Sequence, residues 1–408
     1  MPDPIKPRDI KDVEAAVQWA LADAKTLEIV GQGSKRSLGR PAQTDATLDL
    51  SQLAGVTLYE PEELVLSAKA GTPLSEIERL TASHGQELAF EPMDYGPLLG
   101  VAPAQGTIGG ALATNLSGSR RLKAGAARDH FLGVTAVSGR GEAFKSGGRV
   151  VKNVTGYDLC KLLAGSWGTL AAMTDVTLKT LPRAETEATV LVAGLDDGGA
   201  IAAMATALRS SCDVSAAAHL PAAVASRMLA DAGVAKATTA MRLEGIEASV
   251  AHRMRQLCDL LRSLGELTVL DQHRSRAAWK AIRDTTVFAA DGPAAGRAVW
   301  RISTAPSYGA ELGRRLTAQA DVELAYDWAG GLVWAAVAPS DDAGEAVVRA
   351  ALAEAGGHAM LVRAPVAMRA LVPVFQPQRG PLAALTARVK ESFDPRGVLN
   401  PGRMWAGL

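Results

Sequence analysis

The chain has 408 residues, with 43 lysines and arginines against 43 aspartates and glutamates, so its formal net charge is zero. This length suggests two or three domains, each large enough to bury a core. The balanced charge gives no basis for binding nucleic acid or an anionic membrane by bulk electrostatics.

Three cysteines, Cys160, Cys212 and Cys258, lie far apart in the sequence. Without a CxxC motif or a Cys/His cluster, we expect no iron–sulfur, zinc or other metal site. The first residues lack the apolar core of a signal peptide, and no apolar run approaches the roughly 20 residues that span a bilayer. We therefore expect a cytoplasmic protein without a transmembrane segment.

The first 182 residues alternate strands, helices and glycine-rich loops. Helical periodicity covers residues 10–24, with Asp9 or Asp12 as its cap. Strands are predicted at 26–30 and 46–50, then a strand, turn and helix over 64–85. Residues 131–151 resemble a hairpin that turns near Gly139-Arg140-Gly141, and a strand over 170–182 ends at Pro182.

The pattern changes after Pro182. A strand–helix–strand order recurs over 187–220, 238–272 and 297–338, the last time with an additional strand. This order predicts an α+β domain with helices packed on an antiparallel sheet. A final helix and a tail rich in proline and glycine follow. We predict domains at 1–182 and 183–365, and a segment over 366–408 that returns to the first domain.

The first glycine loop follows the strand at 26–30 directly. A Rossmann fingerprint needs a third glycine where Arg36 stands, and it must open a helix, whereas this segment runs on to Pro41 and another strand. Successive N–H groups around Gly31 and Gly33 could still form an anion-binding nest, with Lys35 and Arg36 adding positive charge. The alternative is a tight surface turn.

Two further segments are rich in glycine. Gly106, Gly109 and Gly110 precede a short helical run, where missing side chains would let a ligand approach the backbone closely; close packing is the alternative explanation. In a third segment, Thr155 and Asp158 fit a capping box for a helix that ends at Gly165.

These motifs, in this order, carry a family resemblance. Residues 1–182 resemble the FAD-binding domain of the vanillyl-alcohol oxidase and p-cresol methylhydroxylase (PCMH) family. Within it, "TIGGALATNLSGSRRLKAGAARDHFLGV" and "GGRVVKNVTGYDLCKLLAGSWGTL" are similar to the FAD-binding E subunits of bacterial glycolate oxidases, and "FDPRGVLNPGRMW" also fits. The resemblance implies an α+β protein with a two-part PCMH-type FAD-binding domain and an antiparallel-sheet cap.

The resemblance also implies which residues contact FAD, from the diphosphate to the flavin ring. They are Gly31, Gln32, Gly33, Ser34, Lys35, Arg36, Pro92, Met93, Thr107, Gly109, Gly110, Thr114, Asn115, Arg128, Asp129, Gly156, Gly168, Thr169 and Asn400, with Arg128 and Asp129 expected on a strand. Lys152 and Asn153 would either polarise the flavin or satisfy buried carbonyls.

Two departures from the family pattern refine this interpretation. Family members that attach FAD covalently commonly use a histidine in the first loop, and this loop has none, so we expect non-covalent FAD. The catalytic 2-hydroxy-acid dehydrogenases carry a histidine-rich motif in the cap, whereas the six histidines here are scattered singly. Arg301 could bind a substrate carboxylate as the catalytic-site residue, or form a structural ion pair.

The resemblance therefore implies one subunit of a complex that oxidises glycolate to glyoxylate. A sister flavin subunit and an iron–sulfur subunit would carry the electrons away and could attach the complex to the inner membrane. The alternatives are a self-sufficient flavin oxidase for another hydroxy acid or alcohol, and a scaffold that binds no FAD. The glycine loops argue against a scaffold, and the missing histidine motif argues against a self-sufficient oxidase.

Overall fold

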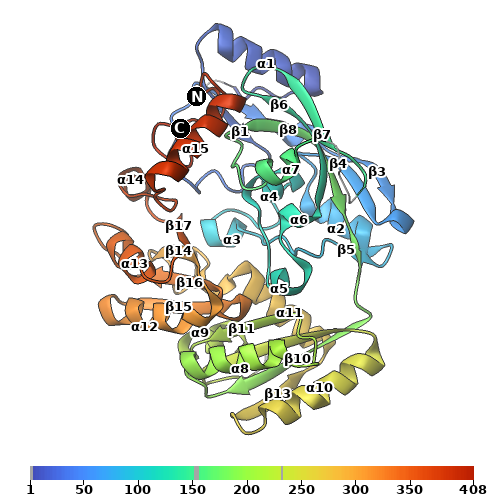
Figure 1. Ribbon diagram of the computed structural model, residues 1–408, viewed down its shortest axis with the longest axis vertical. Coiled ribbons are helices and arrows are strands. Elements are labelled where there is room, and N and C mark those ends of the chain that lie inside the picture. The colour runs from blue at the N-terminus through green and yellow to red at the C-terminus, as the bar shows by residue number, and fades with distance from the viewer. Residues whose placement is uncertain (1–2, 151–155, 231–232) are drawn as a thin grey trace.

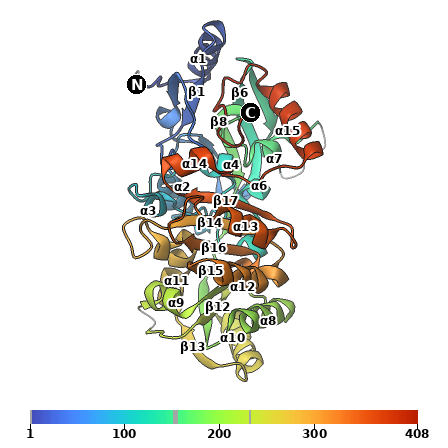
Figure 2. The same ribbon diagram turned by 90° about the vertical axis from the view of Figure 1, so that its left-hand side faces the viewer.

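The computed structural model describes residues 3–150, 156–230 and 233–408. We call residues up to 182, together with the C-terminal segment, the N-terminal body, and the elements from β10 to β17 the cap. Figure 1 shows the N-terminal body above the cap, with both chain ends in the upper part. The view in Figure 2 shows the same two layers.

The N-terminal body begins with α1 (Ile10–Ala22) and two parallel strands, β1 (Leu27–Val30) and β2 (Ala46–Asp49). Asp9 caps α1 by accepting a hydrogen bond from the Asp12 N–H. Next comes an antiparallel sheet in the order β3-β4-β8-β6-β7, formed by β3 (Val56–Glu60), β4 (Val65–Lys69), β6 (Phe131–Ser138), β7 (Ala143–Gly147) and β8 (Ala171–Lys179). The elements between these strands are α2 (Leu74–Ala82), β5 (Gln86–Glu87), α3 (Gly96–Leu99), α4 (Ile108–Thr114), α5 (Arg121–Ala124), α6 (Ala127–His130), α7 (Leu159–Leu163) and β9 (Leu181–Pro182).

The hairpin expected over 131–151 is confirmed by the antiparallel pairing of β6 with β7. Two local predictions are wrong. Arg128 and Asp129 lie on α6 instead of a strand, because the strand begins only at Phe131. The N-cap of α7 is Asp158, whose side chain accepts from the Lys161 N–H; the predicted partner Thr155 lies outside the described residues, as do Lys152 and Asn153.

The cap is built on an antiparallel sheet in the order β13-β10-β12-β11-β15-β16-β14-β17. One face is covered by α8, α10 and α12, and the other by α9, α11 and the N-terminal body. Its strands are β10 (Thr186–Ala193), β11 (Ala216–Leu220), β12 (Thr238–Gly245), β13 (Glu266–Leu270), β14 (Ala298–Ser303), β15 (Val322–Asp327), β16 (Leu332–Val337) and β17 (His358–Arg363). Its helices are α8 (Asp197–Arg209), α9 (Ala222–Met228), α10 (Glu247–Leu261), α11 (Gln272–Asp284), α12 (Gly309–Gln319) and α13 (Glu345–Leu352).

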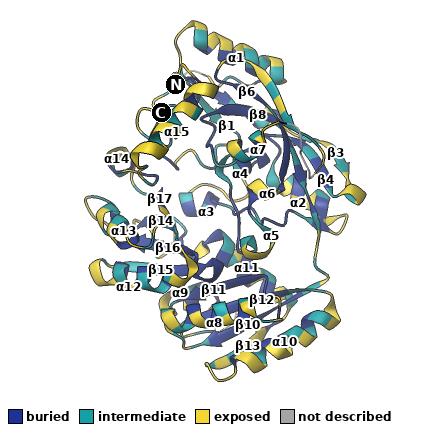
Figure 3. Ribbon diagram, viewed as in Figure 1, coloured by how far each residue is buried: buried dark blue, intermediate teal, exposed yellow. Residues whose placement is uncertain are grey.

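After the cap, α14 (Val366–Leu371) and α15 (Gly380–Phe393) lead back to the N-terminal body. Figure 3 shows buried strands in both sheets and helices that expose one side. Lys390 on α15 is buried, and its ammonium donates to the carbonyls of Thr169 and Leu399 at 2.7 and 3.0 Å. Leu399 forms a parallel bridge with Leu27 of β1, so the tail extends the first small sheet.

Candidate cofactor-binding site

A pocket with about 740 Å³ of empty space, part of it open to solvent, lies where β1, α4, β8 and the tail meet. This size is typical of small-molecule and cofactor sites. Its polar wall comes from the loop after β1, the first turn of α4 and the tail. The apolar wall is formed by Ile29, Val30, Leu50, Ala70, Ala113, Trp167, Ala171 and Met173.

The loop after β1 presents its backbone donors to this pocket. Among the described residues, no acceptor takes a hydrogen bond from the N–H groups of Gln32, Gly33 or Ser34. Gly33 has a left-handed φ of 76°, and its carbonyl accepts from the Arg36 N–H at 3.0 Å, which closes the turn. Consecutive free N–H groups in such a turn form a concave site for an anion.

The charge of the loop comes from Lys35. The pKa of its ammonium is lowered to about 8, mainly by burial; Asp94 partly opposes this shift, and Arg403 adds to it. Arg36 differs, because its guanidinium forms an ion pair with Glu28 in which Nε lies 3.1 Å from Oε1. Lys35 is therefore the cation of this loop that lacks a carboxylate partner among the described residues.

The two adjacent glycines in α4 have different surroundings. A Cβ on Gly109 would lie 2.8 Å from both the Cβ and the carbonyl oxygen of Ala70, and the Gly109 N–H donates to that carbonyl. Packing against the end of β4 therefore explains Gly109 without a cofactor. A Cβ on Gly110 would instead lie 3.2 Å from the Thr107 hydroxyl and 3.5 Å from the Lys35 ammonium, and all three residues line the pocket.

Asn400 joins three segments at the base of the pocket. Its Oδ1 accepts from the Ile29 N–H, and its Nδ2 donates to the Trp167 carbonyl, both at 2.9 Å. A Cβ on Gly168 would lie 2.7 Å from the same Nδ2, so this turn needs a glycine. Arg403, from the same tail, donates to the Lys35 carbonyl at 2.7 Å.

Most of the residues expected at FAD line this pocket: Gly31, Gln32, Gly33, Ser34, Lys35, Arg36, Thr107, Gly109, Gly110, Thr114, Gly168 and Asn400. The others lie elsewhere. Pro92 and Met93 are buried, and Met93 packs in the core that the cap shares with the N-terminal body. Thr169 lines a separate groove beside α15, and Gly156 is exposed with open space around it.

Three expected residues form a local hydrogen-bonded cluster instead. Asn115 ends α4 with a left-handed φ of 51°, and its Oδ1 accepts from the Arg128 N–H at 3.0 Å. Asp129 accepts from the Ala126 N–H at the start of α6. These contacts fix the path of the chain beyond α4.

Sequence reasoning missed Trp167 and Arg403, which also line the pocket. Arg403 had a usable signal, because it is a cation within the tail that was expected to return to the cofactor. The sequence signal for Trp167 was weaker, and consists only of its place before Gly168. Its left-handed φ of 57° could not be predicted from the sequence pattern.

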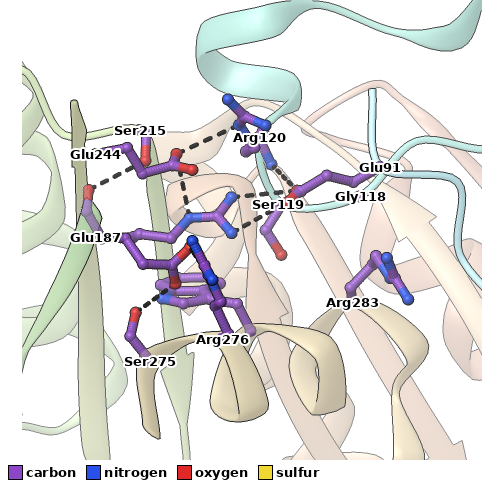
Figure 4. Close-up of polar contacts among 12 residues, drawn as sticks. Glu91, Gly118, Ser119, Arg120, Glu187, Ser215, Glu244, Ser275, Arg276 and Arg283 are labelled. Atoms are coloured by element: carbon purple, nitrogen blue, oxygen red, sulfur yellow. Dashed lines mark hydrogen bonds and ion pairs between the residues drawn. The ribbon is translucent and has the colours of Figure 1, made fainter. Parts of the chain in front are cut away.

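A network of buried charges joins the N-terminal body to the cap. Glu91 receives two hydrogen bonds from Arg242, from Nη1 at 2.9 Å and Nη2 at 3.2 Å. Arg120 approaches Glu244 at 3.3 Å and also pairs with Glu87. Figure 4 shows Glu91, Arg120 and Glu244 of this network between the strands of the cap and the loop that carries Gly118 and Ser119.

Arg301 lies on β14, on the sheet face turned toward the N-terminal body, and does not line the pocket. Its guanidinium stacks on the Trp328 ring, 5.0 Å from the centroid. No carboxylate among the described residues pairs with it, so the alternative of a structural ion pair finds no support. The described residues also hold no group of three or more His, Cys, Asp or Glu side chains suited to a metal ion.

The lining of the pocket suits the chemical groups of a dinucleotide cofactor. A diphosphate suits the free N–H groups of the first loop and the Lys35 ammonium, while the apolar wall suits an aromatic ring. The described residues that line it include no histidine, cysteine or tyrosine.

Comparison with known proteins agrees with this geometry. A model of the FAD binding domain matches residues 4–147. The glycolate oxidase subunit GlcE of Escherichia coli (strain K12) is 33% identical over 396 residues, covering 96% of each chain. Two solved structures have the same fold at low identity. 4-Ethylphenol oxidase from Gulosibacter chungangensis is 14% identical, and p-cresol methylhydroxylase is 13% identical; each has a TM-score of 0.71 and covers 98% of this chain and 88% of its own.

The expected fold class is thus confirmed: a PCMH-type FAD-binding fold carries a cap built on an eight-stranded antiparallel sheet. None of the helices in the described part of the chain is both long and apolar enough to cross a membrane. The chain belongs to the vanillyl-alcohol oxidase and p-cresol methylhydroxylase family of FAD-linked oxidoreductases, and within it to the GlcE-like glycolate oxidase subunits.

Proposed function

We propose that this chain is the FAD-binding subunit of a complex that oxidises glycolate, or a closely related 2-hydroxy acid, to the 2-oxo acid. The observation that carries the proposal is the pocket bordered by three glycine-rich segments, in a chain that aligns with GlcE over nearly its whole length. FAD, when bound, supplies the two-electron acceptor that side chains lack.

Different residues of this chain would bind different parts of FAD. The loop from Gly31 to Lys35 binds the diphosphate through N–H groups and one ammonium. Gly110 leaves space for the cofactor, and Asn400 holds the turn at Gly168 beside it. FAD is held without a covalent bond, which agrees with a lining free of histidine, cysteine and tyrosine in the described residues.

The electrons from the flavin need an acceptor outside this chain. The sequence has no CxxC motif and its cysteines are scattered, so it offers no iron–sulfur cluster of its own. We therefore place the chain with a sister flavin subunit and an iron–sulfur subunit, in the cytoplasm, with contact to the inner membrane through those partners.

A self-sufficient hydroxy-acid dehydrogenase is the second candidate, and it needs a base near the substrate hydroxyl. His219 does not suit this role: it is fully buried inside the cap, between Thr239 and Asp197. His130 is also buried, with Nε2 2.8 Å from the Ala124 carbonyl oxygen. His358 lies at the start of β17 near Arg301, and it is the histidine that could serve as the base in this second candidate.

Anaerobic titration with glycolate tests the proposal. The FAD-loaded chain alone should be reduced slowly or not at all, and reduction should become rapid with the sister subunits present. The flavin should leave the protein on acid precipitation. A chain that takes up no FAD would contradict the proposal, and rapid reduction of the isolated chain would favour the self-sufficient dehydrogenase.

A further inference from the structure

The backbone holds Trp328 in an unusual conformation at the boundary between the cap and the N-terminal body. Trp328 and Ala329 are consecutive non-glycine residues with left-handed φ values of 52° and 54°. The indole N–H donates to the Gly118 carbonyl at 2.9 Å, and the neighbouring Asp327 accepts from the Ser119 hydroxyl at 2.7 Å. Strained residues of this kind persist where the surroundings enforce them, often at functional sites.

Two arginines from different bodies converge on this ring. The guanidinium of Arg121 lies 4.6 Å from the Trp328 centroid, and that of Arg301 lies 5.0 Å from it. Within the described residues, neither guanidinium forms a hydrogen bond or an ion pair within 4.0 Å. Burial and the nearby Arg301 lower the pKa of Arg121, and Asp129 opposes them only in part. The other arginines stacked on rings are engaged with acidic groups: Arg242 with Glu91, Arg315 with Glu311 and Glu354, and Arg349 with Glu345.

The hydroxyl of Tyr95, a neutral hydrogen-bond donor of the N-terminal body, lies against the same face of the sheet as Arg301. Arg301 stands opposite Trp334 in the antiparallel pair of β14 and β16, so their side chains share that face. Tyr95 packs edge-on against Trp334, with ring centroids 6.3 Å apart. The Tyr95 side chain is only 2% exposed, and its hydroxyl has no hydrogen-bond partner in the described residues. A buried hydroxyl without a partner costs free energy unless a ligand or water meets it.

We propose that Arg121 and Arg301 together bind the carboxylate of the substrate between the two bodies, and that Arg121 is a specificity-determining residue for anionic substrates. This inference rests on the proposed function, since it names the group by which that substrate is held. Two guanidinium groups that no carboxylate engages directly complement a substrate carboxylate in the sign of their charge and in planar geometry. A neutral alcohol would leave both guanidinium groups without a bound anion, so the site discriminates against it.

Oxalate, a carboxylate that cannot undergo the proposed oxidation, is the probe, and isothermal titration of the FAD-loaded protein is the measurement. Arg121→Met and Arg301→Met should each weaken oxalate binding at least tenfold, and Arg121→Lys should lose less. Neutral glycolamide should bind more weakly than glycolate to the native protein, and that preference should shrink in Arg121→Met.

Arg315→Met is the matched control, because Arg315 also stacks on a ring, Tyr308, but pairs with carboxylates; it should bind oxalate normally. Unchanged oxalate affinity in folded, FAD-loaded Arg121→Met would overturn the inference, even if glycolate still reduced the flavin. Arginine-dependent oxalate binding in a protein that no hydroxy acid reduces, with or without partners, would support the carboxylate site and refute the proposed function instead.

Discussion

Lys35 is the single residue whose titration should control cofactor binding. Its pKa of about 8 means that the ammonium is charged below pH 8 and becomes neutral above it while the pocket is free of ligand. A diphosphate favours the charged form and raises this pKa, so FAD binding above pH 8 requires uptake of a proton. We therefore expect FAD affinity to fall about tenfold between pH 7 and pH 9.

Fluorescence titration of the apoprotein with FAD across this pH range checks the expectation. Lys35→Arg keeps its charge throughout and should show a nearly flat profile over the same range. Lys35→Met should bind weakly at every pH. A profile for the native protein as flat as that of Lys35→Arg would show that Lys35 does not titrate with the cofactor.

The neighbouring glycines of α4 should respond differently to the same substitution. Gly109→Val forces a side chain into Ala70 and should lower the free energy of unfolding by about 1–3 kcal/mol, as overpacking does. Gly110→Val points toward Lys35 and should weaken FAD at least tenfold, equivalent to about 1.4 kcal/mol, with a smaller effect on the apoprotein. Urea unfolding and FAD titration of both variants separate the two effects; equal FAD loss without destabilisation of Gly109→Val would contradict this assignment.

At the scale of elements, the loops beside β5 and α5 are joined to the cap sheet by charges that have little access to water. Arg242 on β12 is the centre, with Glu91 from the N-terminal body on one side and Glu244 on the other. These carboxylates hold the pKa of its guanidinium above the ordinary value, although burial opposes them. The network thus fixes the cap in position over the N-terminal body.

Removal of Arg242, the central cation of this network, should lower the free energy of unfolding strongly. Arg242→Met leaves Glu91 and Glu244 without their shared partner, and breaking a buried pair in this way costs about 3–5 kcal/mol. Arg227→Met, which breaks a more exposed pair with Glu323, should cost about 1 kcal/mol or less. Chemical denaturation of both variants gives the comparison. Equal losses would mean that the network contributes no more than a single, partly buried ion pair.

At the scale of the whole molecule, Asn400 holds together segments that are 371 residues apart in the chain. Asn400→Ala would leave the Ile29 N–H and the Trp167 carbonyl unpaired in a buried place, which should cost about 2–5 kcal/mol in the free energy of unfolding. Gln272→Ala, which removes one exposed hydrogen bond to the Glu185 carbonyl, should change it by less than about 0.5 kcal/mol.

Excess FAD should recover part of the stability lost in Asn400→Ala, because a ligand that binds only the folded state shifts the unfolding equilibrium. Unfolding curves with and without FAD measure this recovery. A variant as stable as Gln272→Ala would show that the tail is held by other contacts, such as those of Lys390.

Local patterns predicted much of this molecule. Alternating apolar residues located β6, β7 and the main strands of the cap, and the glycine spacing after β1 located one wall of the pocket. The failures concern contacts between distant segments. Gly109 needs to be a glycine because it packs against Ala70, and Arg301 and Arg121 lie near each other because both stack on Trp328. The residues of each contact are far apart in the sequence, so no local spacing predicts it. The boundaries at residues 182 and 365 stay predictions.

The pocket is lined by residues from both ends of the chain, and this affects when the protein can bind its cofactor in the cell. Gly31 and Lys35 are made early on the ribosome, whereas Asn400 and Arg403 emerge only after the entire cap. The anion-binding loop can therefore form during translation, but the enclosed pocket cannot. Cofactor capture is then a late event that follows synthesis, and a nascent chain arrested within the cap would remain unable to retain FAD.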